Sequence, residues 1–556
     1  MKLVECVPNF SEGRDMAKIE LITNEIRGVE GVRLLDVDPG KDTNRTVVTF
    51  IGTPDETVEA AFRAIRKASE VIDMRIHTGA HPRMGATDVC PFVPVRGVTM
   101  DDCVELARRL GKRVGDELGI PVYFYEYAAS RPERRNLASV RAGEYEGLAA
   151  RLADPAWKPD CGPAEFNPGA GATAISAREF LIAYNVNLNT RDTRIANEIA
   201  FSIREKGRAR KDGDGRIMRG SDGETLMEPG IFRECKAVGW YMEDFGRAQV
   251  SINLTNFKVT PPHLVFDECS RIATGLGARV TGSELVGLIP LDALLQAGRH
   301  YLGKMGRLTG VPESELIHIA ALSMGLGDLY PFEPDKKIIE YQFRRPESLA
   351  AMSVTKFADL LSTDSPAPGG GSVAALCGAL SGALSAMVCA LTHGKKGYEK
   401  DYEEMERVGV AGQRLKEEFL ADVDRDTEAF NRVMEAMRMK KKTDAEKEAR
   451  DTAIEQRTKE ATTIPLGVLR RTMEAAGIAR IVGERGNRNS ASDAGVAALA
   501  ARTAAEGAYL NVIINLAGIK DRDFAEAARG EAEKIRGEVA AHVAETMRIV
   551  EKSIVK

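Results

Sequence analysis

The 556-residue chain changes character near residue 350, and this change most restricts the folds open to it. Prolines are spread through the first part, whereas after Pro368 only Pro465 remains. The later part is rich in Ala, Glu, Lys and Arg, and its apolar residues recur with the period of an α-helix. Helical periodicity with so little helix-breaking proline predicts an all-α region. A chain of this length is also expected to form several domains.

The first part alternates short apolar runs, which predict strands, with longer amphipathic stretches, which predict helices. For example, "RTVVTFIG" (45–52) predicts a strand and "PDETVEAAFRAIRKASEVI" (54–72) predicts a helix. The order β-α-β-β-α-β occurs twice, which is typical of ferredoxin-like subdomains with helices on one face of an antiparallel sheet. The predicted class is therefore α+β followed by all-α. We expect an N-terminal subdomain at 1–178, a related subdomain at 179–330, a linker at 331–351 and a helical-bundle domain at 352–556.

Composition restricts the partners and the compartment. The net charge of −5 gives no reason to expect nucleic acid or a membrane surface as a partner. The eight cysteines form no CxxC pair, and scattered thiols suit a reducing cytoplasm. The N-terminal stretch "MKLVECVPNFSEGRD" lacks the apolar run of a signal peptide. These features predict a cytoplasmic protein.

One segment has the length of a membrane span. Residues 369–393 carry no charged side chain other than His393, and about 20 apolar residues suffice to cross a bilayer. However, Gly378, Gly382 and Ala386 recur at a spacing of four, which provides a smooth face for close helix packing. Most of the other apolar residues are Ala, which favours membrane insertion only weakly. We therefore expect a buried helix.

Two of the seven histidines lie in "RIHTGAHPRMGATDVCPFVPV" (75–95). Gly79 between His77 and His81, and Pro82 directly after them, predict a loop rather than a helix. A zinc site would need both imidazoles on one face and a third ligand, and the sequence offers no such cluster. We expect no metal site, and a loop-stabilising role in hydrogen bonding for His77.

His81 is the candidate acid–base residue of this loop. An imidazole with a pKa near its usual value of about 6.5 can accept and donate a proton at neutral pH. Asp36 and Asp38 end the predicted strand "VRLLDVD" and could orient the imidazole, although capping of the following turn is the simpler role. Arg45 and Arg83 could hold substrate carboxylates with a bidentate fork, or act as structural arginines.

The helical part holds two further candidates. The turn "TDSPAPGGGSVAALCGAL" brings Ser372 into a helix start that could cradle an anion, or it could simply allow close helix packing. In "FLADVDRDTEAFNRVMEAM", Asp426 falls within the apolar stripe of a helix and Asp424 falls toward the polar side. A carboxylate on a buried stripe is costly unless it is ion-paired or functional. Asp426 is therefore the stronger catalytic candidate, and Asp424 stays an alternative.

Residues 1–330 resemble glutamate formiminotransferases. The resemblance is carried by "VECVPNFSEGR", "LLDVD", "TNRTVVTFIG", "HPRMGATDVCPFVPVRGV" and "RAGEYEGL". It implies transfer of a formimino group from N-formiminoglutamate to N5 of tetrahydrofolate, with His81 as the acid–base and Asp38 as the assisting carboxylate. A single imidazole can take the proton of the attacking amine and return it to the leaving amine. The resemblance assigns folate binding to Gly162, Pro163, Ala164, Glu165, Phe166, Asn167, Pro168, Gly169, Ala170 and Gly171.

Residues 352–556 resemble formiminotetrahydrofolate cyclodeaminases. The matching strings are "PAPGGGSVAAL", "DVDRDTEAFNRVMEAM", "GNRNSASDAGVAALAA" and "GAYLNVIINL". The resemblance implies an all-helical, dimerising domain in which N10 attacks the formimino carbon on N5 and ammonia leaves. Its catalytic aspartate best matches Asp426, with Asp424 close to it. Weak candidates for pterin contacts are Asn487, Asp493, Asn511 and Asn515, for which capping or packing is the simpler role.

The two resemblances occur in the order of the bifunctional formimidoyltransferase-cyclodeaminase family. That family implies a transferase and lyase of histidine degradation and one-carbon metabolism, tetrahydrofolate as a polyglutamylated co-substrate, no metal, and homo-oligomers built from dimers, up to an octamer. Alternatives are another donor, such as formiminoglycine or formylglutamate, and a non-catalytic folate-binding scaffold. The polar, Gly-rich stretch 209–232 departs from the family pattern and is expected to form a loop.

Overall fold

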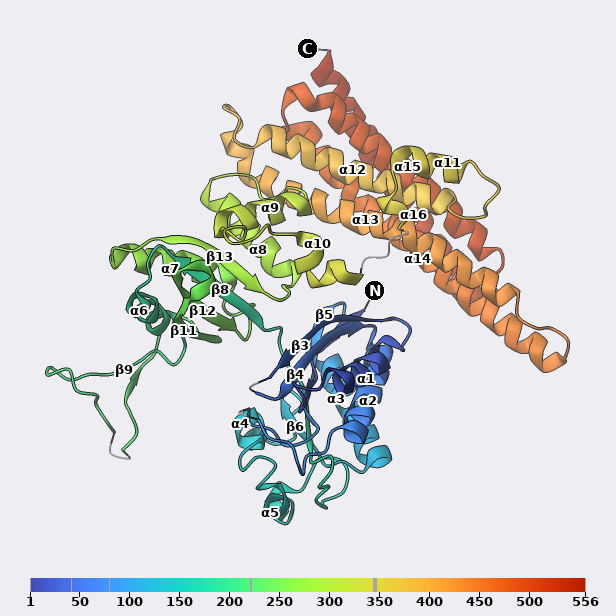
Figure 1. Ribbon diagram of the computed structural model, residues 1–556. Helices are drawn as coiled ribbons and strands as arrows, with labels where there is room; N and C mark the ends of the chain where they lie inside the picture. Colours follow the sequence, from blue (N-terminus) through green and yellow to red (C-terminus); the bar gives the residue numbers. More distant parts are fainter. Residues whose placement is uncertain (1, 42, 80, 221–222, 344–347, 556) are drawn as a thin grey trace. The chain divides into compact units, whose positions relative to one another are not determined.

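The computed structural model describes residues 2–41, 43–79, 81–220, 223–343 and 348–555. The chain divides into two compact units: Met1–Gln296 with Ala321–Arg344, and Ala297–Ala320 with Arg345–Lys556 (Figure 1). The first unit mixes strands and helices and the second is helical, so the predicted order of an α/β part and a helical part is confirmed. Residues 344–347 of the expected linker lie outside the described residues, and the expected boundaries stay predictions.

The first sheet of the first unit is mixed rather than purely antiparallel. Its strand order is β1-β4-β2-β5-β7-β6, with β3 beside β4. The strands β5, β7 and β6 run parallel, and the other pairs are antiparallel. The parallel part departs from the predicted antiparallel sheet because α3 (Met100–Leu118) joins β5 to β6 and the segment 127–172 joins β6 to β7. Both connections are long enough for the crossovers that parallel strands need. The strands are β1 (Leu3–Cys6), β2 (Asn9–Phe10), β3 (Val32–Gly40), β4 (Arg45–Gly52), β5 (Thr87–Arg96), β6 (Val122–Glu126) and β7 (Thr173–Ala177).

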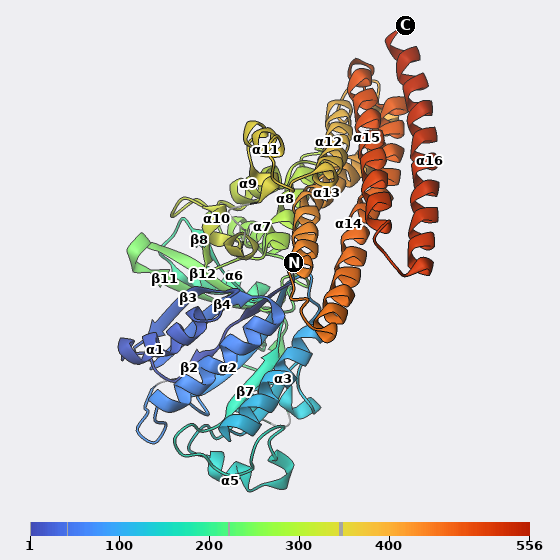
Figure 2. The same cartoon turned by 90° about the vertical axis from the view of Figure 1, so that its right-hand side faces the viewer.

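Helices cover one face of this sheet. Figure 2 shows α1 (Met16–Arg27), α2 (Pro54–Val71) and α3 (Met100–Leu118) side by side against it. Their apolar stripes and the facing strand residues form one continuous buried cluster. A smaller cluster on the opposite face, which includes Tyr123 and Tyr125, packs under the segment with α4 (Leu137–Val140) and α5 (Leu148–Leu152). The sheet is therefore buried on both sides where it supports the site described below.

A second, four-stranded sheet follows in the same unit. Its order is β11-β12-β8-β13 and all its pairs are antiparallel. The helix α6 packs on β11 and β12, and α7 contacts β8 and β13. The bounds are β8 (Ile182–Leu188), α6 (Thr193–Ile203), β11 (Cys235–Met242), β12 (Arg247–Leu254), α7 (Pro262–Gly275) and β13 (Val280–Val286). Apart from the short strands β9 (Arg208–Ala209) and β10 (Met227–Glu228) after α6, these elements follow the predicted order β-α-β-β-α-β.

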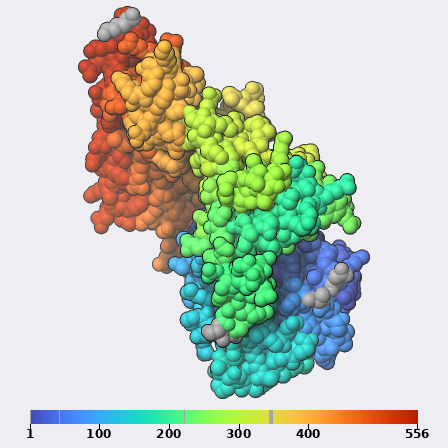
Figure 3. All heavy atoms as spheres, turned by 90° about the vertical axis from the view of Figure 1, so that its left-hand side faces the viewer, coloured from blue at the N-terminus to red at the C-terminus, as the bar shows by residue number. Residues whose placement is uncertain are grey.

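The stretch 209–232, expected to be a loop, is partly paired. The short strands β9 (Arg208–Ala209) and β10 (Met227–Glu228) are antiparallel, and isolated bridges join Lys211 to Ile217 and Arg219 to Thr225. The result is an extended arm that projects from the second sheet (Figure 1) and lies on the surface in Figure 3. Residues 221–222 of this stretch lie outside the described residues.

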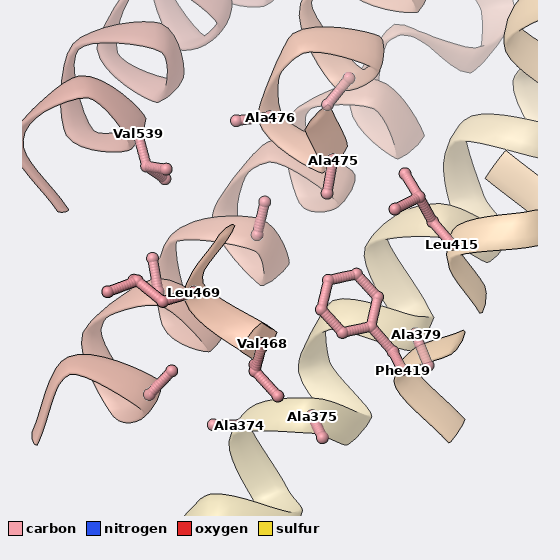
Figure 4. Close-up of a cluster of buried hydrophobic side chains, with 14 of the residues drawn as sticks. Ala374, Ala375, Ala379, Leu415, Phe419, Val468, Leu469, Ala475, Ala476 and Val539 are labelled. Atoms are coloured by element: carbon pink, nitrogen blue, oxygen red, sulfur yellow. The ribbon is translucent and has the colours of Figure 1, made fainter. Parts of the chain in front are cut away.

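The second unit is built on long helices around one apolar core. In Figure 4 the ring of Phe419 on α13 lies close to Ala375 and Ala379 of α12, and Val468 of α14 lies nearby. By length and composition α12 could cross a membrane, but 56% of its most apolar 18-residue window is buried inside the unit. It packs against α13 and α15. The helices are α11 (Val354–Leu361), α12 (Gly370–Thr392), α13 (Tyr402–Met437), α14 (Asp444–Arg485), α15 (Ala491–Leu516) and α16 (Arg522–Ile554).

The close approach of α12 and α13 depends on Gly378. A Cβ atom at this position would lie 2.6 Å from ring carbons of the fully buried Phe419. We expect Gly378→Ala to lower the free energy of unfolding by about 1–3 kcal/mol, because the ring cannot move away in a packed core. Gly477 on α14 has open space around its Cα. As the matched control, Gly477→Ala should instead stabilise by about 0.5–1 kcal/mol. Urea unfolding followed by far-ultraviolet circular dichroism measures both, and equal effects of the two substitutions would contradict this packing.

Candidate active sites

His81 lies in the loop between α2 and β5, where the sequence predicts it. Its Nε2 atom is 2.7 Å from Nη1 of Arg45, at the start of β4. A guanidinium can only donate, so Nε2 must accept and the ring proton of the neutral imidazole must be on Nδ1. The Nδ1 atom is buried and has no hydrogen-bond partner within normal geometry among the described residues. The contact with Arg45 therefore determines which ring nitrogen of the neutral His81 carries the proton.

The surroundings keep His81 neutral. Burial lowers its pKa from the usual value, and the positive charges of Arg45 and Arg141 lower the pKa further. The carboxylate of Asp88 and the backbone of Pro82 oppose this shift. A neutral imidazole is the form that can accept a proton, so the site holds His81 in the state that a general base requires.

Asp88 and Arg141 form a buried ion pair beside His81 that the sequence did not reveal. The carboxylate of Asp88, which is fully buried, accepts a hydrogen bond of 3.0 Å from the backbone N–H of Met84. It also accepts a hydrogen bond of 3.3 Å from Nε of Arg141 and a close one from Nη2. Arg141 belongs to the string "RAGEYEGL", but nothing in that string indicates its partner 53 residues earlier.

Asp38 does not contact His81 as the sequence suggested. Its side chain is exposed on β3, where the residue pairs with Val47 of β4. That register places it on the same face of the sheet as Arg45, and its charge raises the pKa of Arg45, which burial lowers. No hydrogen bond joins Asp38 to His81 among the described residues. Asp38 therefore acts on Arg45 rather than directly on the imidazole.

Arg83 is engaged by residues of the chain itself. Its guanidinium donates to Glu146 at 2.7 and 2.8 Å and to Glu144 at 3.2 Å. Its Nε donates to Nδ1 of His77 at 3.3 Å, and Nε2 of His77 donates to the carbonyl of Asn44 at 2.9 Å. His77 thus ties the loop together as its context predicts. The geometry favours a structural role for Arg83 over the expected one in substrate binding.

A cavity of about 970 Å³ opens beside His81 within the first unit. Its lining combines residues before 179 with residues after 180, so both sheets contribute walls. Its cations are Arg45, Arg135, Arg141, Arg178 and Lys236, and its carboxylates are Glu126, Glu179, Glu205 and Glu234. Tyrosine, asparagine and several apolar side chains also contribute to the lining. A cavity of this size with several cations suits a folate-sized, carboxylate-bearing ligand.

The segment 162–171 runs beside the His81 loop. Gly171 has a φ of +69°, and a Cβ there would lie 2.2 Å from the carbonyl oxygen of Met84. The carbonyl of Ala170 accepts from the N–H of Ala86 at 2.8 Å, and the hydroxyl of Tyr145 donates to the carbonyl of Pro168 at 2.6 Å. None of the residues 162–171 lines the cavity around His81 in the described part of the chain. Their part in folate binding stays a prediction.

In the second unit, Asp426 lies against the start of α12. A Cβ at Gly371 would come within 2.2 Å of its Oδ1, so the carboxylate fills the space that this glycine leaves. The hydroxyl of Ser372 lies 3.1 Å from Oδ2 of Asp426 and 3.0 Å from the carbonyl of Val423. Burial raises the pKa of Asp426, the hydrogen bonds from Ser372 lower it, and the charge of Asp422 raises it. A carboxyl with a raised pKa can deliver a proton at higher pH than an exposed aspartate.

The two neighbouring aspartates have structural partners. Asp424 accepts from the hydroxyl of Ser348 and from the N–H of Leu349, both at 2.7 Å. Asp422, which the sequence did not single out, is buried and pairs with Arg471 at 2.7 Å and Arg425 at 2.9 Å. The buried ion pair considered for this helix therefore belongs to Asp422. Asp426 has no cation partner among the described residues.

Of the weak pterin candidates, Asn511 lies nearest to this aspartate site. A Cβ at Gly370, next to Gly371, would be 3.5 Å from its Nδ2. Asn515 donates to the carbonyl of Ala461 at 3.3 Å, and Asn487 caps a turn and holds Lys395. In the described part of the chain, no group of three His, Cys, Asp or Glu side chains is placed to hold a metal ion.

Known protein families match the first and the second part of the chain separately. The family model for the N-terminal subdomain of the formiminotransferase domain matches residues 3–178, and a formiminotransferase domain model matches 183–344. A formiminotransferase-cyclodeaminase model matches 353–534. A formimidoyltransferase-cyclodeaminase of Dictyostelium discoideum is 42% identical over 539 residues, which covers 96% of each chain. The chain belongs to the formimidoyltransferase-cyclodeaminase family.

Each part of this family member also has relatives of its own. A glutamate formimidoyltransferase of Streptococcus pyogenes serotype M1 is 42% identical and matches 54% of the chain and 93% of its own length. A methenyltetrahydrofolate cyclohydrolase of Methylorubrum extorquens is 41% identical and matches 34% of the chain and 91% of its own length. Both parts of the formimidoyltransferase-cyclodeaminase pattern are thus present in one chain.

Proposed function

We propose that the chain is a folate-dependent bifunctional enzyme. It transfers the formimino group of N-formimino-L-glutamate to N5 of tetrahydrofolate, and then closes 5-formiminotetrahydrofolate to 5,10-methenyltetrahydrofolate with release of ammonia. The observation that carries this proposal is a neutral histidine at a cationic cavity in the first unit, together with a buried aspartate without a cation partner among the described residues of the second. Each group matches the proton transfer that its reaction needs.

In the first reaction, His81 serves as both base and acid. N5 of tetrahydrofolate attacks the formimino carbon, and Nε2 of His81 takes the proton that N5 loses. The tetrahedral carbon then carries three nitrogens, which are N5, the former imine nitrogen and the nitrogen of glutamate. His81 returns the proton to the nitrogen of glutamate, so that this C–N bond breaks and the C=N bond to the former imine nitrogen forms again. The carboxylates near the cavity stabilise the cationic stages of this exchange. Asp38 contributes at longer range through Arg45.

The cations of the cavity hold the carboxylates of the two substrates. Arg45 has its guanidinium at the cavity and makes no ion pair among the described residues, so it is our first candidate for the donor carboxylate. Arg135, Arg178 and Lys236 extend the positive surface toward the second sheet, where a polyglutamyl tail of the folate can lie. Residues 162–171 support the pterin end from beside the His81 loop.

In the second reaction, Asp426 moves the proton. N10 attacks the formimino carbon on N5 and forms a five-membered ring with an amino group on a tetrahedral carbon. The carboxyl of Asp426 protonates that amino group, which leaves as ammonia, and the resulting carboxylate takes the proton that N10 loses, which restores the acid form. Its raised pKa keeps the acid form available. We assign this role to Asp426 rather than to Asp424, because two hydrogen bonds already engage the Asp424 carboxylate.

Hydration of the methenyl product is the second candidate for the helical unit. The identity of 41% with a methenyltetrahydrofolate cyclohydrolase favours it. In that reaction water adds to the methenyl carbon, Asp426 takes the proton of the water, and N5 receives a proton as its C–N bond breaks, which gives 10-formyltetrahydrofolate. The tetrahedral intermediates of both reactions differ only in an amino or a hydroxyl group, so one carboxylate can serve both.

The exposed apolar face of the helical unit supports a homo-oligomer. Neighbouring helices α12 and α15 carry large apolar side chains that are exposed: Leu380, Met387, Leu391, Val496, Leu499, Leu510 and Ile514. Several large exposed apolar side chains on two helices that pack together are typical of a subunit interface. This face can pair with the same face of a second copy to form the dimers from which an octamer is built.

We also propose a cytoplasmic location and ferredoxin-like subdomains. The ferredoxin-like fold is supported by the strand order β11-β12-β8-β13 of the second sheet.

The half-reactions can be tested separately. With N-formimino-L-glutamate and tetrahydrofolate, we expect release of glutamate. With supplied 5-formiminotetrahydrofolate, we expect ammonia and the absorbance of the methenyl product. Formiminoglycine and formylglutamate in place of the donor test the donor alternatives. Formation of 10-formyltetrahydrofolate from the methenyl compound would favour hydration, and absence of every turnover would leave only the scaffold function.

A further inference from the structure

The Arg45 guanidinium contacts the nitrogen of His81 that must accept a proton in the proposed reaction. The proposed transfer requires a free lone pair on the imidazole, and a neutral imidazole has one. With the proton on Nδ1, that lone pair is on Nε2, which lies 2.7 Å from the Arg45 guanidinium. The Nδ1 atom cannot take over, because it is buried. In the ligand-free protein, the lone pair that His81 needs as a base therefore already accepts the hydrogen bond from Arg45.

Arg45 can leave this contact more readily than the other arginines near it. Arg83 is held by Glu146 and Glu144, and Arg141 is held by the fully buried Asp88. Arg45 has no ion-pair partner among the described residues, although the charges of Asp88 and Asp38 act on it. Of its five guanidinium donors, its hydrogen bond to His81 uses one. Its remaining donors are available to a ligand in the cavity.

A substrate carboxylate competes well for Arg45. A guanidinium–carboxylate pair has charge on both partners and two parallel hydrogen bonds, and is stronger than a bond from guanidinium to a neutral nitrogen. Arg45 is half-buried, which strengthens the attraction relative to one in water. When the guanidinium turns toward the carboxylate, Nε2 of His81 loses its donor and the nearby positive charge is neutralised.

We propose that Arg45 is a positioning residue that masks Nε2 of His81 in the free enzyme and unmasks it when a carboxylate of the donor binds. This inference rests on the proposed transfer function and adds that the donor carboxylate switches on the base. It gives the site a means of selection, because an amidine without a carboxylate would leave His81 masked. The charged groups that face His81 are Arg45 from β4, Asp88 from β5, and Arg141.

The test is a histidine titration by nuclear magnetic resonance on the full-length chain with isotope-labelled imidazoles. The chain has seven histidines, and His81→Gln identifies the signal of His81. In ligand-free protein, Arg45→Met removes the donor and the charge, so the pKa of His81 should rise and the nitrogen shift of Nε2 should lose its hydrogen-bond signature. Arg45→Lys keeps a cation and should keep the pKa low. Arg66→Met, an exposed arginine on α2, is the control and should change nothing.

The ligand arm uses L-glutamate, which carries the carboxylates of the donor without the reactive group. Saturating glutamate should raise the pKa of His81 in the wild-type chain and change it little in Arg45→Met. In turnover, Arg45→Met should lower kcat/KM for the donor by about 10- to 100-fold, which corresponds to the loss of charged hydrogen bonds. The inference is overturned if Arg45→Met leaves the pKa of His81 unchanged, or if glutamate does not move it in the wild type. Turnover of the wild type with an unresponsive His81 would remove this inference alone, whereas a responsive His81 without turnover would remove the proposed function alone.

Discussion

We expect His81→Ala to lower the rate of formimino transfer by about 10²- to 10⁴-fold, which is the usual contribution of a positioned acid–base group. The imidazole is the group at the cavity that is held neutral, since burial and the charges of Arg45 and Arg141 lower its pKa. Without it, N5 has no acceptor for its proton and the glutamate nitrogen has no donor. The measurement is glutamate release from N-formimino-L-glutamate in the presence of tetrahydrofolate.

The chain provides its own control for this substitution. The His81→Ala variant should still cyclise supplied 5-formiminotetrahydrofolate at the wild-type rate, because that reaction uses Asp426 in the second unit. A loss of both activities would indicate misfolding rather than loss of an acid–base group. Transfer at an undiminished rate by a folded variant would exclude His81 as the acid–base residue.

The second large effect is expected at Asp426. Asp426→Asn keeps the size of the side chain and its contact with Ser372 but removes the proton, so cyclisation should fall by about 10²- to 10⁴-fold. The chain should then accumulate 5-formiminotetrahydrofolate, with transfer intact. Because the acid form protonates the leaving amino group, and because burial raises the pKa of Asp426, wild-type cyclisation should decline as pH rises through that raised pKa.

Asp424→Asn is the matched control for Asp426→Asn. Both residues lie on α13 two positions apart, but the Asp424 carboxylate accepts hydrogen bonds from Ser348 and Leu349. Asp424→Asn should therefore weaken the attachment of the segment around residue 348 and leave the chemistry of cyclisation near the wild-type rate. A larger loss of cyclisation in Asp424→Asn than in Asp426→Asn would reverse the assignment.

Much of the fold was predictable because its helices and strands bury apolar residues that recur at regular spacing in the sequence. The helices α2 and α3 each keep one apolar face and one polar face over about five turns, and the strands of the second sheet have clear apolar runs. The strand β7 was missed because "TAISA" is short and has Ile175 as its one large apolar residue, although all five residues are buried. Its parallel pairing with β5 and β6 follows from a tertiary crossover, which no local pattern reports.

The candidate sites were predictable only as single residues. The Gly- and Pro-containing loop pointed to His81, and the apolar stripe of α13 pointed to Asp426. The contact between Arg45 and His81 joins residues 36 positions apart, and the pair of Arg141 with Asp88 spans 53. Asp422 was missed because its partner Arg471 lies on another helix. Such pairings arise from how strands and helices meet, and a single sequence carries no local trace of them.

The most direct test of the whole account is one coupled assay on the purified full-length chain. It receives N-formimino-L-glutamate and tetrahydropteroylpolyglutamate, and methenyl-folate absorbance and released ammonia are followed together. We predict that both signals rise in equal amounts, that His81→Ala lowers the rates of both by about 10²- to 10⁴-fold, and that Asp426→Asn does so while glutamate is still released. Methenyl-folate formation without ammonia, or neither signal from a folded chain that still binds folate, would contradict the bifunctional enzyme.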